Sequence, residues 1–188
     1  MPTLTARRTR RMTLAQFAAK YMDVPHCELV RGKVERLMPG GGEHSAATIN
    51  ITRLLGNWTV ETRRGRVLGN EAGLVTRRAP GTVRGVDVAY CSYARVPKGK
   101  RPSGFWTVPP ELVVEVIGKG QGWPRLWEKA LEYFLIGVER VWIVDPGARC
   151  VHVLRRDGEP RKYTQNETLR DPEILPGFSC KVAEFFED

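Results

Sequence analysis

The segment that most constrains the fold is the apolar run at residues 111–117, Glu-Leu-Val-Val-Glu-Val-Ile. A strand that is apolar at nearly every position is covered on both faces, so this run predicts a central strand of a sheet. A glycine-rich turn follows at 118–122, and Pro124 suits the first position of a helix that extends to about residue 136. Gly137 is expected to end that helix with a left-handed cap.

Helices and strands also mix along the rest of the chain. We expect one helix that begins after Thr13 as its N-cap, and a long one over about 43–64 with a buried apolar face. Shorter strands are expected at residues 26–31, 33–37, 65–69, 73–77, 84–92, 141–144, 150–154, 161–164 and 178–182. The sequence therefore predicts a single α/β domain over 12–188, with a mixed β-sheet flanked by helices, after a flexible basic arm at 1–11.

The composition is that of a globular domain, because 41% of the 188 residues are hydrophobic and 27% are charged. No apolar run approaches the roughly 18 residues that span a bilayer, so no membrane partner is expected. The four cysteines are scattered and no secretory signal is evident, which indicates reduced thiols and a cytoplasmic protein. No clustered zinc ligands, acyl-transfer motif or nucleotide-binding motif is found.

Positive charge is concentrated in the first part of the chain. Residues 1–101 hold 19 Lys and Arg against 7 Asp and Glu, a net charge of +12, and residues 102–188 hold 11 against 14, a net charge of −3. A basic half on one domain is typical of a protein with a polyanionic partner, most commonly nucleic acid. A soluble protein with an unspecific excess of charge is the equally simple alternative.

Three acids lie inside apolar strands, where an unpaired carboxylate would cost several kcal/mol. They are Glu28, Asp87 and Glu115. Because buried carboxylates are paired with cations or bind a metal, their convergence would suit a hard divalent cation such as Mg²⁺, with Mn²⁺ as a substitute. The alternative is that arginine or lysine side chains neutralise them in a purely structural role.

A lysine beside such a site would stabilise charge on an attacked phosphate. Lys129 is the candidate, because it follows the Glu115 strand on the next helix and lies one turn before Tyr133, so the two share a side. The alternative for Lys129 is a solvated lysine that pairs with Glu128 or Glu132. Tyr133 is expected to be half-buried and to pack against its neighbours. The alternative is that it faces the cleft.

In their order along the chain, these motifs resemble the Uma-two family, regarded as endonucleases of the PD-(D/E)XK restriction-endonuclease-like superfamily. The resemblance covers about residues 12–186 and rests on segments 28–35, 86–89, 111–116, 128–133, 137–146 and 175–178, with His44 on the long helix. It implies a DNA endonuclease in which Asp87 and Glu115 bind the metal and Glu28 is an additional acid. The superfamily lysine normally lies two positions after the second acid, where this chain has Ile117, and the resemblance implies that Lys129 replaces it.

The chain departs from the family pattern at residues 118–122, where Gly-Lys-Gly-Gln-Gly replaces a usual Ser-Pro-Ser. This change favours an alternative, a catalytically degenerate nuclease-fold module that binds nucleic acid or a protein partner. A third hypothesis is a structural or oligomerisation protein, such as a homodimer, whose apolar segment 182–186 packs on a second copy.

Further residues are expected at the substrate side of the site. His44 is expected to line the cleft or to serve in packing. Basic residues of the loop after the 84–92 strand and of the glycine-rich turn are expected to contact phosphates, and they are Arg95, Lys98, Lys100, Arg101 and Lys119. For this loop and for the arm at 7–11, ordinary solvated loops are the alternative.

Overall fold

A computed structural model describes residues 11–187 of the chain, so the basic arm expected at 1–11 lies outside the described residues except for Arg11. The helices are α1 (Leu14–Tyr21), α2 (Gly42–Thr62), α3 (Trp123–Ile136) and the short 3-10 helix η1 (Val182–Phe185). The strands are β1 (Cys27–Val30), β2 (Lys33–Arg36), β3 (Gly65–Arg77), β4 (Thr82–Ser92), β5 (Leu112–Val116), β6 (Arg140–Asp145), β7 (Cys150–Arg155), β8 (Arg161–Thr164), β9 (Thr168–Leu169) and β10 (Cys180–Lys181).

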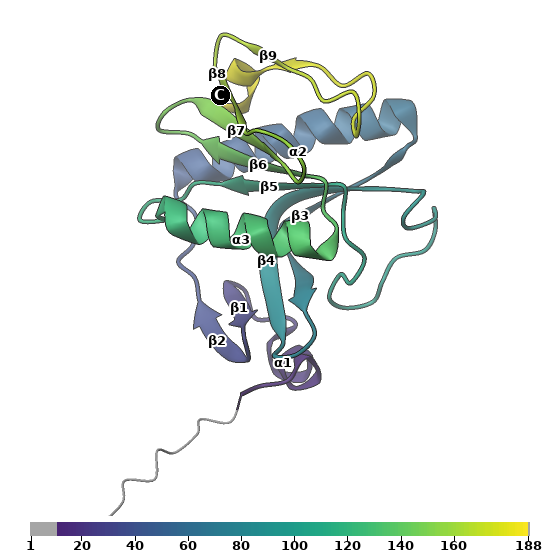
Figure 1. Cartoon of the computed structure of the whole chain (residues 1–188), viewed down its shortest axis with the longest axis vertical. Coiled ribbons are helices and arrows are strands. Elements are labelled where there is room, and N and C mark those ends of the chain that lie inside the picture. Colours follow the sequence, from purple (N-terminus) through teal and green to yellow (C-terminus); the bar gives the residue numbers. More distant parts are fainter. Residues whose placement is uncertain (1–10, 188) are drawn as a thin grey trace, which may run out of the picture.

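A mixed sheet organises the domain (Figure 1). Its strand order is β2-β1-β4-β5-β6-β7-β8, with β3 paired to β4, and only β5 and β6 are parallel to each other among these ladders. The parallel pair is joined through α3, which is the connection that parallel strands require. The predicted α/β domain with a mixed sheet flanked by helices is confirmed.

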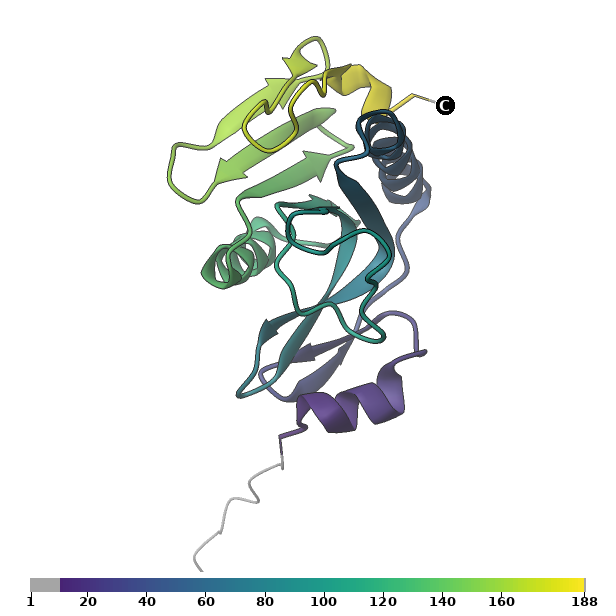
Figure 2. The ribbon, with the colours of Figure 1, turned by 90° about the vertical axis from the view of Figure 1, so that its right-hand side faces the viewer.

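The sheet has a helix on each face, as Figure 2 shows for α2 and α3. Leu112, Val114 and Val116 of β5 pack in the cluster that contains α2, whereas Val113 packs in the cluster that contains α3. All five residues of β5 are buried, as expected for a central strand. Because side chains alternate along a strand, Glu115 faces the same side as Val113, toward α3.

Helix boundaries agree closely with the sequence patterns. Thr13 caps α1 with a complete capping box, and Gly137 ends α3 at φ +104°, in the left-handed region that glycine adopts without strain. Within the described residues, no helix combines the length and the apolar character that crossing a membrane requires.

Two expectations about strands are corrected. The strands predicted at 65–69 and 73–77 are one strand, β3, interrupted by a bulge at Asn70 and Glu71. The strand predicted at 178–182 is reduced to β10 followed by η1. Val182 and Phe185 are fully buried in the chain's own core, so the segment 182–186 does not offer the apolar surface that the oligomerisation hypothesis required.

Candidate active site

Glu115 lies at the centre of the candidate site, buried between the sheet and α3. Its side chain is 3% exposed and is held by two residues of that helix. Lys129 Nζ donates to Glu115 Oε2 at 2.6 Å, and the Tyr133 hydroxyl donates to Oε1 at 2.6 Å. Lys129 and Tyr133 are four residues apart and therefore share one side of α3, as predicted from their spacing.

Burial gives this group unusual protonation equilibria. Burial raises the pKa of Glu115 to about 7. The positive charge of Lys129 lowers this pKa and offsets burial only in part, and the negative charge of Asp87 raises it further. Burial also opposes the charge on Lys129, but Glu115 and Glu28 outweigh it and raise the pKa of this lysine. Lys129 thus stays protonated at neutral pH and can donate hydrogen bonds, but it cannot act as a proton acceptor.

Asp87 lies next to Glu115 on the neighbouring strand. β4 and β5 pair with Val88 opposite Val114, and the same antiparallel register continued by one position places Asp87 opposite Glu115. Asp87 Oδ2 accepts the Val116 N–H at 2.7 Å. The Asp87 side chain is 15% exposed, and its Oδ1 has no hydrogen-bond partner among residues 11–187.

The bulge in β3 lies directly across from Asp87. Gly69 pairs with Val88 and Ala72 with Val86, so that Asn70 and Glu71 together oppose Asp87. Bulges of this kind bend a strand and re-aim side chains beside active sites. The bend is visible in β4 itself, because Val86 packs in the α3-side cluster and Val88 in the α2-side cluster although they are two residues apart.

His44, near the start of α2, approaches Asp87 from the other side. Its Nε2 lies 3.3 Å from Asp87 Oδ2, and this hydrogen bond raises the pKa of His44. The ring packs closely on the glycine-rich connection to α2, since a Cβ added at Gly40 would lie 2.5 Å from His44 Nδ1. The structure therefore places His44 at the cleft, against the proposed metal-binding acid.

Glu28 joins the site through Lys129 rather than through Asp87. Its Oε1 accepts the Gly85 N–H at 3.1 Å and lies 3.4 Å from Lys129 Nζ, and its Oε2 pairs with Arg84 at 3.0 Å. Burial opposes ionisation of Glu28, but the charges of Lys129 and Arg84 outweigh it and lower the pKa. Both Glu28 oxygens thus contact cations or an amide, and Glu28 holds Lys129 in position.

Arg84 is a functional candidate that the sequence patterns missed. It is a buried arginine whose guanidinium binds both oxygens of Glu132, at 2.8 and 2.9 Å, as well as Glu28. A basic residue inside the apolar strand before Asp87 is the sequence signal that could have identified it. Glu132, one of the two partners in the alternative interpretation of Lys129 as a solvated lysine, is thus occupied by Arg84.

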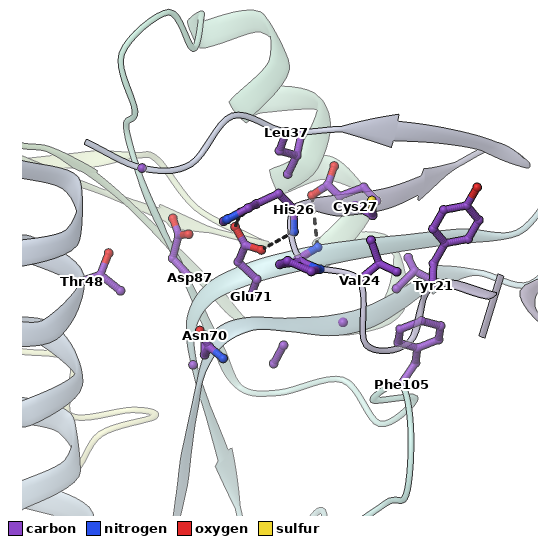
Figure 3. A pocket seen from close by; sticks show the side chains of 18 of the residues that line it. Tyr21, Val24, His26, Cys27, Leu37, Thr48, Asn70, Glu71, Asp87 and Phe105 are labelled. Carbon is purple, nitrogen blue, oxygen red and sulfur yellow. Dashed lines mark hydrogen bonds and ion pairs between the residues drawn. The ribbon is translucent and has the colours of Figure 1, made fainter. Parts of the chain in front are cut away.

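A cleft of about 940 Å³ opens beside this cluster, between the β1–β2 hairpin, β3 and the start of α2 (Figure 3). Glu28, His44 and Asp87 line it, whereas Glu115, Lys129 and Tyr133 lie behind Asp87 and do not. Tyr133 is fully buried, so it supports Glu115 and does not face the cleft. In the described part of the chain, no three His, Cys, Asp or Glu side chains are grouped as ligands of one metal ion.

The basic residues expected to bind phosphate fall into two groups. Arg95 is engaged within the chain, because its guanidinium contacts the carbonyls of Pro109 and Pro110 and the carboxylates of Glu111 and Glu139. Its expected phosphate contact is therefore corrected to a structural role that holds the loop. The others are exposed, namely Lys98, Lys100, Arg101 and Lys119.

Two of the exposed basic segments lie near the cleft. Lys119 follows Gly118, where an added Cβ would lie 3.8 Å from the His44 ring. Lys100 and Arg101 belong to the loop whose Gly104 and Phe105 line the cleft. These positions allow basic side chains to approach a polyanion from outside an otherwise acidic site.

Comparisons with known proteins identify the family of the chain. A family model of Uma2, described as "Putative restriction endonuclease", matches residues 15–183. The chain belongs to the Uma2 family. The family description supports a nuclease-like function, and no curated protein matches the chain.

A solved structure shares the Uma2 chain's fold. It is "a putative nuclease belonging to DUF820 from Anabaena variabilis ATCC 29413", which matches with a TM-score of 0.80 and 17% sequence identity. The match covers 93% of this chain and 97% of that one. At this identity the likeness establishes the fold alone.

Proposed function

We propose that this Uma2 chain is a magnesium-dependent endonuclease that hydrolyses phosphodiester bonds of DNA. The observation that carries the proposal is the placement of Asp87 and Glu115 on opposed positions of two paired strands, with Lys129 bound to Glu115. Two carboxylates and a charged lysine are the groups that a metal-assisted phosphoryl site needs.

The acid pair fits a divalent cation on three grounds. Carboxylate oxygens are the ligands that Mg²⁺ and Mn²⁺ prefer. Asp87 Oδ1 is free of partners in the described residues, while His44 and the Val116 N–H hold Oδ2 in place. Glu115 has a raised pKa partly because the Asp87 charge is close, and a cation between the two would compensate that repulsion.

A divalent cation bound there would polarise the phosphate, lower the pKa of a bound water and neutralise the leaving oxygen. The chain's own groups supply the rest. Asp87 and Glu115 provide ligands, and Tyr133 keeps Glu115 oriented. Lys129, kept charged by Glu28 and Glu115, would stabilise negative charge at the phosphate from its position behind Asp87. Glu28 and Arg84 fix the direction of Lys129.

DNA cleavage with Mg²⁺ and with EDTA tests the proposal. Asp87→Asn and Glu115→Gln keep the size of each side chain, and each is expected to lower the Mg²⁺-dependent rate at least about 100-fold. Asp157→Asn, in an exposed turn far along the chain, is the matched control and should cut like wild type. Cleavage by a folded Asp87→Asn variant at the wild-type rate would refute the mechanism.

The second candidate is a nuclease-fold module without catalysis. It is favoured by the lack of a three-ligand group in the described residues and by the glycine-rich Gly118–Gly122 turn beside His44. Such a module would bind nucleic acid through its exposed lysines without needing a metal. Metal binding at the acid pair therefore separates the two candidates.

A further inference from the structure

Left-handed backbone is uncommon at residues other than glycine, and six described residues adopt it. Three of them occupy positions that ordinarily require this conformation, in the β1–β2 turn, at the C-cap of α2 and in the β6–β7 turn, and they are Arg31, Arg63 and Arg149. The other three are His26, Asn70 and Glu71, with φ of 55°, 58° and 55°. All three line the cleft beside Asp87.

Strain of about 1–3 kcal/mol per residue persists only where surrounding contacts enforce it, and it clusters at functional sites. Here the enforcing contact is a clamp between two of the strained residues. Glu71 Oε2 accepts the His26 backbone N–H at 3.1 Å, and Glu71 Oε1 accepts His26 Nδ1 at 2.8 Å. Figure 3 shows the His26 side chain above Glu71, and Asp87 on the far side of Glu71 from His26.

The clamp determines which atom of His26 faces the cleft. A carboxylate only accepts hydrogen bonds, so Nδ1 carries the ring proton of the neutral histidine and Nε2 is left as an acceptor. Nε2 has no partner among residues 11–187. His26 Nε2 and the carboxylates of Glu71 and Asp87 thus form a cleft wall made of acceptors.

This wall does not suit a phosphate, which is itself an acceptor. No lysine or arginine of the described chain lines the cleft. Among the groups of a nucleotide that donate hydrogen bonds are the exocyclic amines of adenine, cytosine and guanine, which offer two N–H donors on one nitrogen. Beyond the clamp the cleft becomes apolar, with Tyr21, Val24 and Phe105 at the end away from Asp87 (Figure 3), and its volume is sufficient for a nucleotide.

We propose that the cleft binds an unpaired nucleobase that carries an exocyclic amine, and that His26 Nε2 and Glu71 accept hydrogen bonds from that amine. The base lies toward Tyr21 and Phe105, at the apolar end of the cleft. A base in a duplex cannot enter such a pocket, so the preferred DNA is single-stranded or locally unpaired. The inference rests on the proposed function and specifies its substrate.

Single-stranded octamers of cytosine and thymine test it, because both bases are pyrimidines and only cytosine has an exocyclic amine. Binding is measured by fluorescence anisotropy in EDTA, so that no cleavage occurs. Wild type should bind the cytosine octamer about tenfold more tightly, as expected for a good hydrogen-bonded base contact. Equal affinity for the two octamers would overturn the proposal.

His26→Asn is the informative variant. Asparagine tolerates the left-handed backbone, and its amide can replace Nδ1 as donor to Glu71, but it has no atom at the place of Nε2. The variant should keep the wild-type melting temperature and its thymine affinity while it loses the cytosine preference. His152→Asn, on β7 outside the cleft, should keep the preference. A His26→Asn protein that still prefers cytosine would overturn the proposal.

If His26→Asn fails to fold, Glu71→Gln replaces it, and an unchanged cytosine preference in that variant would likewise overturn the proposal. The outcome is independent of the nuclease test. Loss of the base preference leaves Mg²⁺-dependent cleavage and its abolition by Asp87→Asn intact. Conversely, failure of the Asp87→Asn test would refute the nuclease mechanism while the binding preference could still be observed.

Discussion

The raised pKa of Glu115 makes a quantitative prediction about stability. In the unfolded chain this group has an ordinary pKa of 4.5, and burial raises it to about 7 in the fold. The folded state therefore binds an additional proton between these values, so the stability due to Glu115 is present below pH 4.5 and is lost as pH rises toward 7. A shift of about 2.5 units corresponds to a loss of about 3 kcal/mol, at about 1.4 kcal/mol per unit.

Glu115→Gln removes this titration and keeps the side chain's size. Urea unfolding in EDTA at pH 4.5, 5.5, 6.5 and 7.5 gives the free energy of unfolding of both proteins, and their difference isolates Glu115. We expect the variant to gain about 3 kcal/mol relative to wild type across this range. Other groups with depressed pKa values, such as Glu28, change stability in the opposite direction but contribute to both proteins.

The exposed Glu61→Gln is the matched control and should follow the wild-type curve at every pH. Parallel curves for wild type and Glu115→Gln, or a wild-type protein that gains stability relative to the variant as pH rises, would refute the reasoning. Parallel curves would mean that Glu115 keeps its ordinary pKa in the fold, and a relative gain of wild type with pH would mean that the fold lowers this pKa. In both cases the site would lack a carboxylate with a pKa near 7.

Three other predictions concern the neighbours of the acid pair. Lys129→Met should destabilise the fold by about 3–5 kcal/mol in urea unfolding, because it leaves Glu28 and Glu115 buried without their shared cation; a loss below about 1 kcal/mol would contradict this. Arg95→Ala should lower the melting temperature without changing the salt dependence of DNA binding. Lys119→Ala should leave the melting temperature unchanged and reduce the slope of log affinity against log salt by about 1. The reverse pattern would restore Arg95 as a phosphate ligand. Gly40→Ala should slow Mg²⁺-dependent cleavage by displacing the His44 ring, with little change in stability, and wild-type cleavage would show that His44 does not position Asp87.

The sequence predicts best where one strand or helix contains the whole signal. The apolar run around Glu115 identified a central strand, and the apolar stripe of α3 with Gly137 at its end identified the covering helix. Asp87 and Glu115 lie in apolar strands and were expected to contact hydrogen-bond donors or cations, because burying an unpaired carboxylate costs free energy. That argument selected Glu115 and Asp87 correctly as buried or half-buried groups in close proximity.

The partners themselves depend on contacts between distant segments. Glu28 and Arg84 are 56 residues apart, and nothing in either segment indicates that this arginine, rather than a metal, neutralises the acid. The clamp between His26 and Glu71 depends on a bulge that joins two predicted strands into one. Arg95 has the composition of a phosphate ligand in its loop, yet nearby carbonyls and acids occupy it.

Calorimetric titration with Mn²⁺ tests the central claim most directly, because it measures whether Asp87 and Glu115 bind a divalent cation at all. Wild type should bind with a heat that depends on the buffer at pH 6, since the cation displaces the proton held by Glu115. Asp87→Asn should weaken binding at least about tenfold. Wild-type protein that takes up no Mn²⁺, or an Asp87→Asn variant that binds it equally well, would contradict the account.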